Sequence, residues 1–176
     1  MTLLQYFNTP ETVLPSELID GIRYVADAPF VSHQRVVLKL ATALQDHAAS
    51  AGGEVLIAPV DVVLDERRPL VLQPDLLYLA PEQTALALDR IYGAPALVVE
   101  ILSPRPRIGD LNERVALFAQ YGVREIWVYD QPARALDVLS CADGRVSSRL
   151  RIDDGPIVSA VLPRFTRSMF EILGQW

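Results

Sequence analysis

Residues 96–103, Ala-Leu-Val-Val-Glu-Ile-Leu-Ser, form an apolar run that is interrupted by one carboxylate, Glu100. A short apolar run rich in β-branched residues is typical of a strand that is buried on both faces, as in α/β proteins. An ionised carboxylate in such a strand is costly unless it is paired or bound to a cation. Glu100 is therefore the first candidate functional residue.

A second acid, Asp75, lies in the apolar segment 71–79. If the two segments form neighbouring strands, the carboxylates of Asp75 and Glu100 can converge on one hard cation, and oxygen ligands suit Mg²⁺ or Mn²⁺. Such an ion lowers the pKa of a bound water and polarises a phosphoryl oxygen. The alternative is that Asp75 belongs to a turn and Glu100 pairs with an arginine. Spacing alone leaves both interpretations open.

The remaining patterns predict one α/β domain that spans residues 1–176 and contains a central mixed β-sheet flanked by helices. The 176-residue chain has no internal repeat and no linker that would divide it. We expect a loop or a helical turn within residues 81–92. Helices are predicted at 10–19, 32–48, 111–121 and 167–173, and strands at 22–26, 54–64, 71–79, 96–103, 125–129, 135–140, 145–152 and 157–161.

Two residues of the predicted helix 111–121 have alternative roles. Glu113 follows Asp110 by three residues, so the two resemble a capping box that begins the helix. Arg114 borders the apolar stripe of this helix. It either lays its stem along the stripe and keeps its head in water, or reaches the acids and neutralises a phosphate.

Three further polar residues are second-tier candidates. His33 stands at the beginning of the helix that Ser32 is expected to cap, where a cap or a surface position is the simpler interpretation. Glu17 precedes a turn and is expected to be solvated, or else to supply a helix-borne carboxylate to the site. Asp61 is either a site residue or part of a structural ion pair.

The formal net charge of −6 argues against broad electrostatic attraction to nucleic acid. A DNA-binding surface must then be a local patch, for which Arg105, Arg107, Arg114 and Arg124 are available. The single cysteine cannot form an internal disulfide, no apolar stretch approaches the roughly 18 residues that span a bilayer, and no secretory signal is evident. We therefore expect a cytoplasmic location and no membrane partner.

Several motifs occur in a specific order along residues 17–130. They are Glu17-Leu-Ile-Asp-Gly, Ser32-His33, Pro74-Asp75, Ala94-Pro-Ala-Leu-Val-Val-Glu-Ile-Leu-Ser-Pro104, Asp110-Leu-Asn-Glu-Arg114 and Tyr121-Gly-Val-Arg-Glu-Ile-Trp-Val-Tyr-Asp130. In order and spacing the chain resembles the Uma-two family of restriction-endonuclease-like proteins, which belong to the PD-(D/E)XK nuclease superfamily.

The resemblance implies a restriction-endonuclease-like core with Asp75 and Glu100 as ligands of a divalent ion. It implies that the backbone carbonyl of Ile101 can supply a further ligand, and that the substrate is DNA. It also implies a homodimer or higher homo-oligomer, for which the apolar segments near Val128 and Leu136 offer interface material.

The chain departs from the superfamily pattern at the position of its lysine. Two residues after the second acid stands Leu102, and the following helix, to which the lysine has moved in this family, carries Arg114. Lys39 is the only lysine, and its place on the first long helix makes it a poor substitute. An arginine keeps its proton in proteins, so Arg114 cannot act as a general base, but it can orient water or stabilise charge on phosphate.

Two functions follow from these observations. The first is a Mg²⁺- or Mn²⁺-dependent endonuclease that hydrolyses DNA phosphodiester bonds. The alternative is a catalytically weakened relative that binds nucleic acid or protein, or forms a structural homo-oligomer. The acidic charge and the missing lysines favour the alternative.

Overall fold

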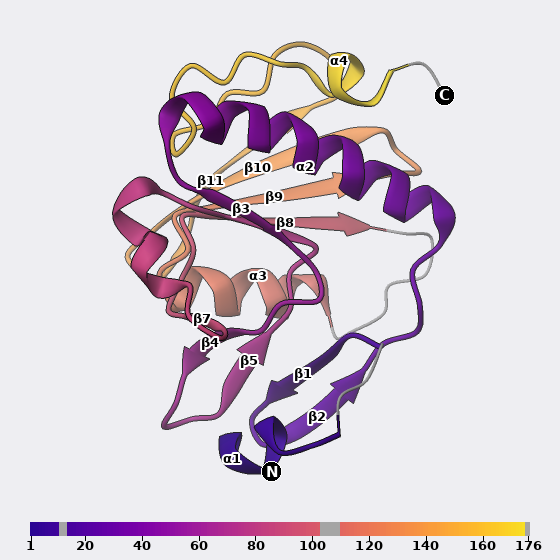
Figure 1. Ribbon diagram of the computed structural model, residues 1–176. Coiled ribbons are helices and arrows are strands. Elements are labelled where there is room, and N and C mark those ends of the chain that lie inside the picture. Colours follow the sequence, from indigo (N-terminus) through magenta and orange to yellow (C-terminus); the bar gives the residue numbers. More distant parts are fainter. Residues whose placement is uncertain (11–13, 103–109, 175–176) are drawn as a thin grey trace.

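The strands form two mixed sheets in the computed structural model, which describes residues 1–10, 14–102 and 110–174 (Figure 1). The larger sheet has the order β11-β10-β9-β8-β6-β3, and the smaller has the order β2-β1-β5-β4-β7. Strands β8 and β9 pair in parallel, as do β4 and β7, and the other described pairs are antiparallel. The predicted α/β class is confirmed.

The bounds of the elements are as follows. The strands are β1 (Ser16–Ile19), β2 (Ile22–Val25), β3 (Glu54–Ile57), β4 (Val62–Asp65), β5 (Leu70–Leu72), β6 (Leu76–Leu79), β7 (Ile91–Tyr92), β8 (Leu97–Leu102), β9 (Glu125–Asp130), β10 (Ala135–Ala142) and β11 (Arg145–Ile152). The helices are α1 (Leu3–Phe7), α2 (Val31–Ala51), the 3₁₀ helix η1 (Pro81–Leu86), α3 (Leu111–Gln120) and α4 (Met169–Leu173).

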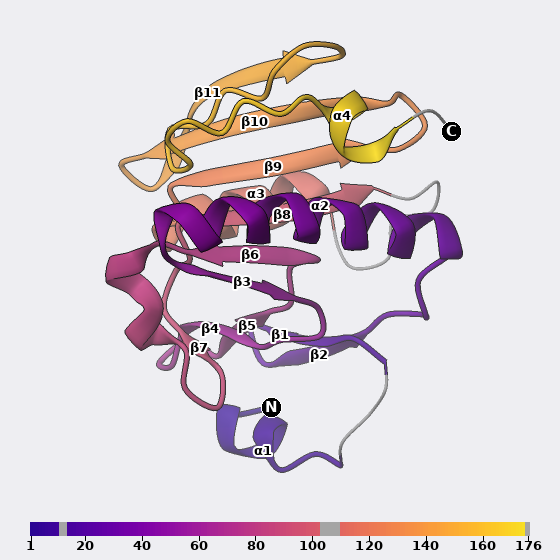
Figure 2. The same ribbon diagram turned by 45° about the horizontal axis from the view of Figure 1, so that its top comes forward.

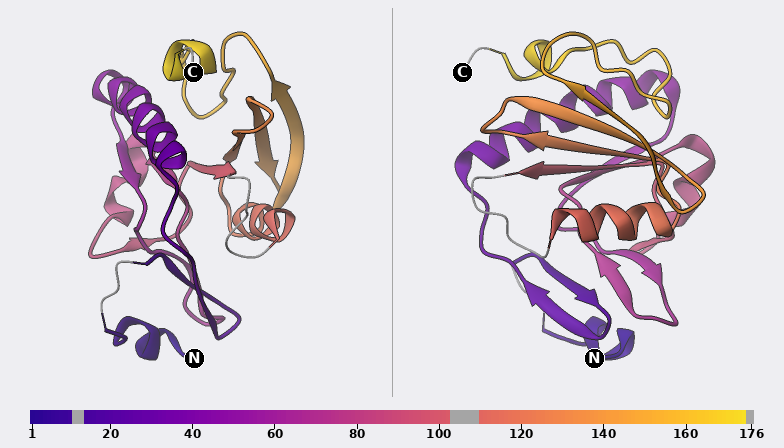
Figure 3. Two further views of the ribbon diagram at one scale, coloured as in Figure 1. Left: turned by 90° about the vertical axis from the view of Figure 1, so that its right-hand side faces the viewer. Right: turned by 180° about the vertical axis from the view of Figure 1, so that it is seen from behind.

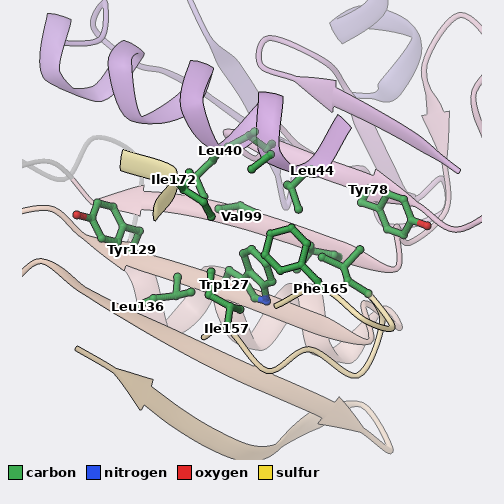
Figure 4. Close-up of a cluster of buried hydrophobic side chains, with 14 of the residues drawn as sticks. Leu40, Leu44, Tyr78, Val99, Trp127, Tyr129, Leu136, Ile157, Phe165 and Ile172 are labelled. Atoms are coloured by element: carbon green, nitrogen blue, oxygen red, sulfur yellow. The ribbon is translucent and has the colours of Figure 1, made fainter. Parts of the chain in front are cut away.

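One face of the larger sheet packs against α2 and α4 (Figure 2). Alternate residues of β8 point to this face, including Val99, and they meet Leu40 and Leu44 of α2 around Trp127 (Figure 4). The period of two along a strand requires that the residues between them point the other way.

The opposite face of the larger sheet packs against α3 and the smaller sheet (Figure 3). Val98 of β8 and Phe118 of α3 are fully buried there, together with Leu72 of β5. Because Glu100 follows Val98 by two residues, its side chain lies on this face, near the beginning of α3.

Two predicted strands are each divided between the sheets. Segment 54–64 forms β3 and β4, which are separated by Pro59, and segment 71–79 forms β5 and β6, which are separated by Pro74. A proline cannot donate to the ladder, so a strand ends beside it. In each case the chain crosses from one sheet to the other. This crossing places Asp75 directly before β6.

The predicted helix 10–19 is wrong. Residues 16–19 form β1, which pairs with β2 across a turn at Asp20 and Gly21, both of which have positive φ. Asp and Gly tolerate this backbone conformation, so the hairpin turn is local in origin. The short helix α1 lies earlier in the chain, and residues 11–13 lie outside the described part.

Smaller differences concern the ends of elements and the expected interface. Helix α2 begins directly after Phe30, without the Ser32 cap, and residues 157–161 form no strand. Val128 and Leu136 are buried within the two cores, so these side chains cannot form the expected homodimer interface. Among the described residues, no helix has the length and apolarity that crossing a membrane requires.

Candidate functional site

Asp75 and Glu100 lie opposite each other at the end of the β6–β8 ladder. The register pairs Leu76 with Val99, so the next position places Asp75 across from Glu100. Residues directly opposite in an antiparallel pair point to the same face, with Cβ atoms about 5 Å apart. The Oδ2 atom of Asp75 accepts a 2.7 Å hydrogen bond from the backbone N–H of Ile101. The two acids are therefore held close together, Glu100 within β8 and Asp75 in the bend that directly precedes β6.

Arg114 extends from α3 to this pair. Its Nη2 donates to Oε1 of Glu100 at 2.6 Å, and its Nη1 donates to Oε2 of Glu17 at 2.5 Å. The Arg114 side chain is buried, with 7% of the residue exposed. The interpretation that placed its head in water is wrong. Both parts of the alternative considered from the sequence are present: Asp75 stands in a bend directly before β6, and Glu100 pairs with an arginine, Arg114.

Glu17 brings the smaller sheet into the site. It is fully buried, at 0% exposed, so the expectation that it is solvated or borne on a helix is wrong. While its Oε2 accepts from Arg114, its Oε1 accepts from the backbone N–H of Gln73 at 2.6 Å. Glu17 thus connects α3 to the segment that carries Asp75.

His33 contacts the other side of Asp75. Its Nε2 lies 3.1 Å from Oδ1 of Asp75, and the imidazole is buried. The expectation of a cap or a surface position is therefore wrong. The Nδ1 atom has no hydrogen-bond partner within the described part of the chain. The contact fixes one oxygen of Asp75, while Ile101 fixes the other.

Burial of Glu100 raises the pKa of its carboxyl group to about 7. The neighbouring carboxylates of Asp75 and Glu17 add to this increase, and the Arg114 guanidinium offsets part of it. Burial opposes the charged form of Arg114, but Glu100 and Glu17 outweigh it and raise the guanidinium pKa. Two carboxyl groups thus share one guanidinium, a third, that of Asp75, lies beside Glu100, and another cation would be stabilised here.

Two of the candidate acids lie outside this site. Asp61 accepts from the side chain of Gln73 at 2.8 Å and lies 3.3 Å from Nε of Arg90, which agrees with the structural ion pair. Glu113 is exposed on the first turn of α3, where Asp110 caps the helix by accepting from the N–H of Asn112 at 2.6 Å.

Gln73 was missed by the sequence reasoning. Its signal was a polar residue within an apolar run, directly before Pro74-Asp75. The structure describes only two of the four arginines of the expected basic patch, Arg114 and Arg124. Arg124 pairs with Glu82 on the surface at 3.1 Å, whereas Arg105 and Arg107 lie outside the described residues.

The carboxylate oxygens of Asp75 and Glu100 suit a hard cation that keeps several ligands from water or substrate, rather than one that is coordinated by protein alone. Within residues 1–10, 14–102 and 110–174, no cluster of three or more His, Cys, Asp or Glu side chains has the arrangement of a metal site. Mg²⁺ commonly uses only one or two carboxylates and takes its other ligands from water and substrate phosphate. Asp75 and Glu100, which offer two carboxyl groups side by side, fit this pattern.

Comparisons with known proteins identify the family and the fold of this chain. The Uma2 family model, described as "Putative restriction endonuclease", matches residues 4–169. A crystal structure from Anabaena variabilis, described as a "putative nuclease belonging to DUF820", superimposes with a TM-score of 0.81 and 15% sequence identity. The superposition covers 98% of this chain and 97% of the Anabaena chain. At 15% sequence identity, this similarity shows the fold alone. No curated protein matches the sequence.

Proposed function

The chain belongs to the Uma2 family, and from the geometry of its site we propose that it is a divalent-metal-dependent endonuclease that hydrolyses DNA phosphodiester bonds. The observation that carries the proposal is the pair of acids, Asp75 and Glu100, which lie close together where the paired strands β6 and β8 meet the bend before β6. Fold alone does not determine function, so the proposal rests on this pair and on Arg114.

In the proposed mechanism, Asp75, Glu100 and the backbone carbonyl of Ile101 would hold Mg²⁺ or Mn²⁺. When bound, such an ion lowers the pKa of a water and polarises a phosphoryl oxygen. His33 keeps Asp75 in place through its Nε2 atom. Metal sites commonly contain such a contact, in which a neighbouring side chain like His33 orients the carboxylate ligand.

Arg114 supplies a fixed positive charge beside the acids. Because it keeps its proton, it neutralises charge that develops on the phosphate and does not accept a proton from water. Glu17 holds one nitrogen of the guanidinium, so the charge remains in place if Glu100 turns toward a cation.

A binding-only relative remains the second candidate, because two observations favour it. Arg114 already neutralises Glu100, and the position of the superfamily lysine is the apolar Leu102. Such a protein would bind nucleic acid or a protein partner, or form a homo-oligomer, without cleavage. We propose that residues 1–176 act as one domain in either case, since the two sheets share a core.

The test is incubation of plasmid and single-stranded DNA with Mn²⁺, in which the wild type is compared with Glu100→Ala. We expect the wild type to nick the plasmid and Glu100→Ala to be inactive. Glu113→Ala is the matched control, because it removes an exposed acid from the same neighbourhood and should remain active. Equal nicking by the wild type and Glu100→Ala would exclude the proposed site.

A further inference from the structure

An exposed aromatic residue stands next to the candidate site. In the β1–β2 hairpin, Tyr24 is directly opposite Glu17, so the two side chains point to the same face. Glu17 is fully buried against Arg114, but Tyr24 is 38% exposed. Ile22 lies two residues before Tyr24 on the same face and is 57% exposed. We call Ile22 and Tyr24 the Tyr24 ledge.

The same face of the smaller sheet is covered elsewhere. Leu70 and Leu72 of β5 are buried in the core that contains Phe118 of α3, and Ile19 of β1 packs against that core. The β1–β2 hairpin extends beyond α3 in two opposite views (Figures 1 and 3). At β2 an otherwise buried apolar face thus becomes accessible, one strand from Glu17.

The charge of the protein limits how a nucleic acid can bind beside this site. The net charge is −6, and the cation described at the site, Arg114, is already paired with two carboxylates. Long-range attraction to phosphate therefore contributes little. Stacking of a base on an aromatic ring does not depend on phosphate charge, and together with backbone electrostatics it is a main source of affinity for single strands.

We propose that the Tyr24 ledge binds the unpaired nucleobase of the nucleotide next to the phosphodiester at the Asp75–Glu100 site, so that the substrate is single-stranded DNA at that point. The inference rests on the proposed function and names its substrate class. Bases within a duplex are already stacked on their neighbours, whereas an unpaired base has a free face for the Tyr24 ring. Ile22 extends the apolar surface beside that ring.

The experiment measures DNA binding separately from cleavage. Fluorescence anisotropy gives the affinity for a labelled single strand and for the duplex of the same sequence. The strand has about 12 nucleotides, which lies within the usual site size of single-strand-binding proteins. Ca²⁺ replaces Mn²⁺, and a gel checks that the DNA stays intact. The variants are Tyr24→Ala and Tyr24→Phe, with Phe170→Ala as the matched control. Phe170 is an exposed aromatic residue of α4, at the far end of the molecule from β2 (Figure 1).

We expect the wild type to bind the single strand more tightly than the duplex. Tyr24→Ala should weaken single-strand binding about tenfold and reduce this preference, since alanine removes the stacking ring. Tyr24→Phe and Phe170→Ala should bind like the wild type. If the wild type binds and cleaves DNA but Tyr24→Ala has unchanged affinity, the ledge proposal is wrong and the nuclease proposal stands. If the wild type neither binds nor cleaves any DNA, both proposals fail.

Discussion

Glu17 and Arg114, which are 97 residues apart in the chain, form a buried ion pair between β1 of the smaller sheet and α3. Arg114 also pairs with Glu100 of the larger sheet. The candidate site is therefore assembled from both sheets, and its charge balance depends on a residue from the first hairpin.

Replacement of Arg114 tests what this position contributes. Arg114→Lys should raise the nicking rate, because a buried lysine can approach neutrality and positioned proton transfer contributes about 10²-fold or more. Arg114→Met should lower the rate and destabilise the fold by about 3–5 kcal/mol, since two buried carboxyl groups lose their partner. Plasmid nicking and urea denaturation measure the two effects. No change, or a loss of activity, in Arg114→Lys would assign Arg114 another role.

Replacement of Glu17 separates positioning from metal binding. In Glu17→Gln the guanidinium loses one of its two charge partners, so stability should fall by about 1–3 kcal/mol and nicking should decrease. Mn²⁺ affinity should remain close to that of the wild type, because Glu17 is not a proposed ligand. Asp20→Asn is the matched control: it removes the exposed pair with Arg68 in the same hairpin and should cost less than about 1 kcal/mol.

The raised pKa of Glu100 makes metal-free stability depend on pH. Burial raises this pKa from 4.5 to about 7, so between these values the folded protein binds more protons than the unfolded chain. The contribution is fully present below pH 4.5 and is lost as the pH rises through about 7. In EDTA, wild-type stability should therefore decline over this range relative to Glu100→Gln. Parallel pH profiles of the two proteins from urea denaturation would contradict the buried state of Glu100.

Not every buried acid of this protein serves the site. Glu125 is buried at the beginning of β9, where it accepts hydrogen bonds from the indole of Trp127, the hydroxyl of Ser159 and the N–H of Ala160. Glu125→Ala leaves these donors without their acceptor and should cost about 3 kcal/mol or more of stability. At a temperature where the variant is folded, its Mn²⁺ affinity should equal that of the wild type. Loss of Mn²⁺ binding by folded Glu125→Ala would give this acid a functional role.

The sequence predicted the central strand β8 and the helix α3 well because their patterns are local. The apolar run around Glu100 and the stripe of α3 are periodic, and both elements lie within a residue or two of their predicted bounds. Pro74 was a sequence signal for a break between strands. The prediction nevertheless ran one strand through it, whereas β5 and β6 belong to different sheets.

The partners of Arg114 could not be predicted from its neighbours in the chain. Both interpretations of this residue agreed with its place beside an apolar stripe, and the choice depends on Glu17 in a distant hairpin. The hairpin was missed because residues 16–19 form a strand of only four residues, which is too short to show a period. An error in that short segment therefore concealed the burial of Glu17 and the exposure of Tyr24.

Isothermal titration calorimetry with Mn²⁺ tests the central claim most directly, which is that Asp75 and Glu100 share one divalent cation. The wild type should bind one ion per chain, and Asp75→Asn and Glu100→Gln should each bind at least about tenfold more weakly, while each variant remains folded. A wild type that takes up no Mn²⁺, or two variants that bind it as tightly as the wild type, would contradict the account.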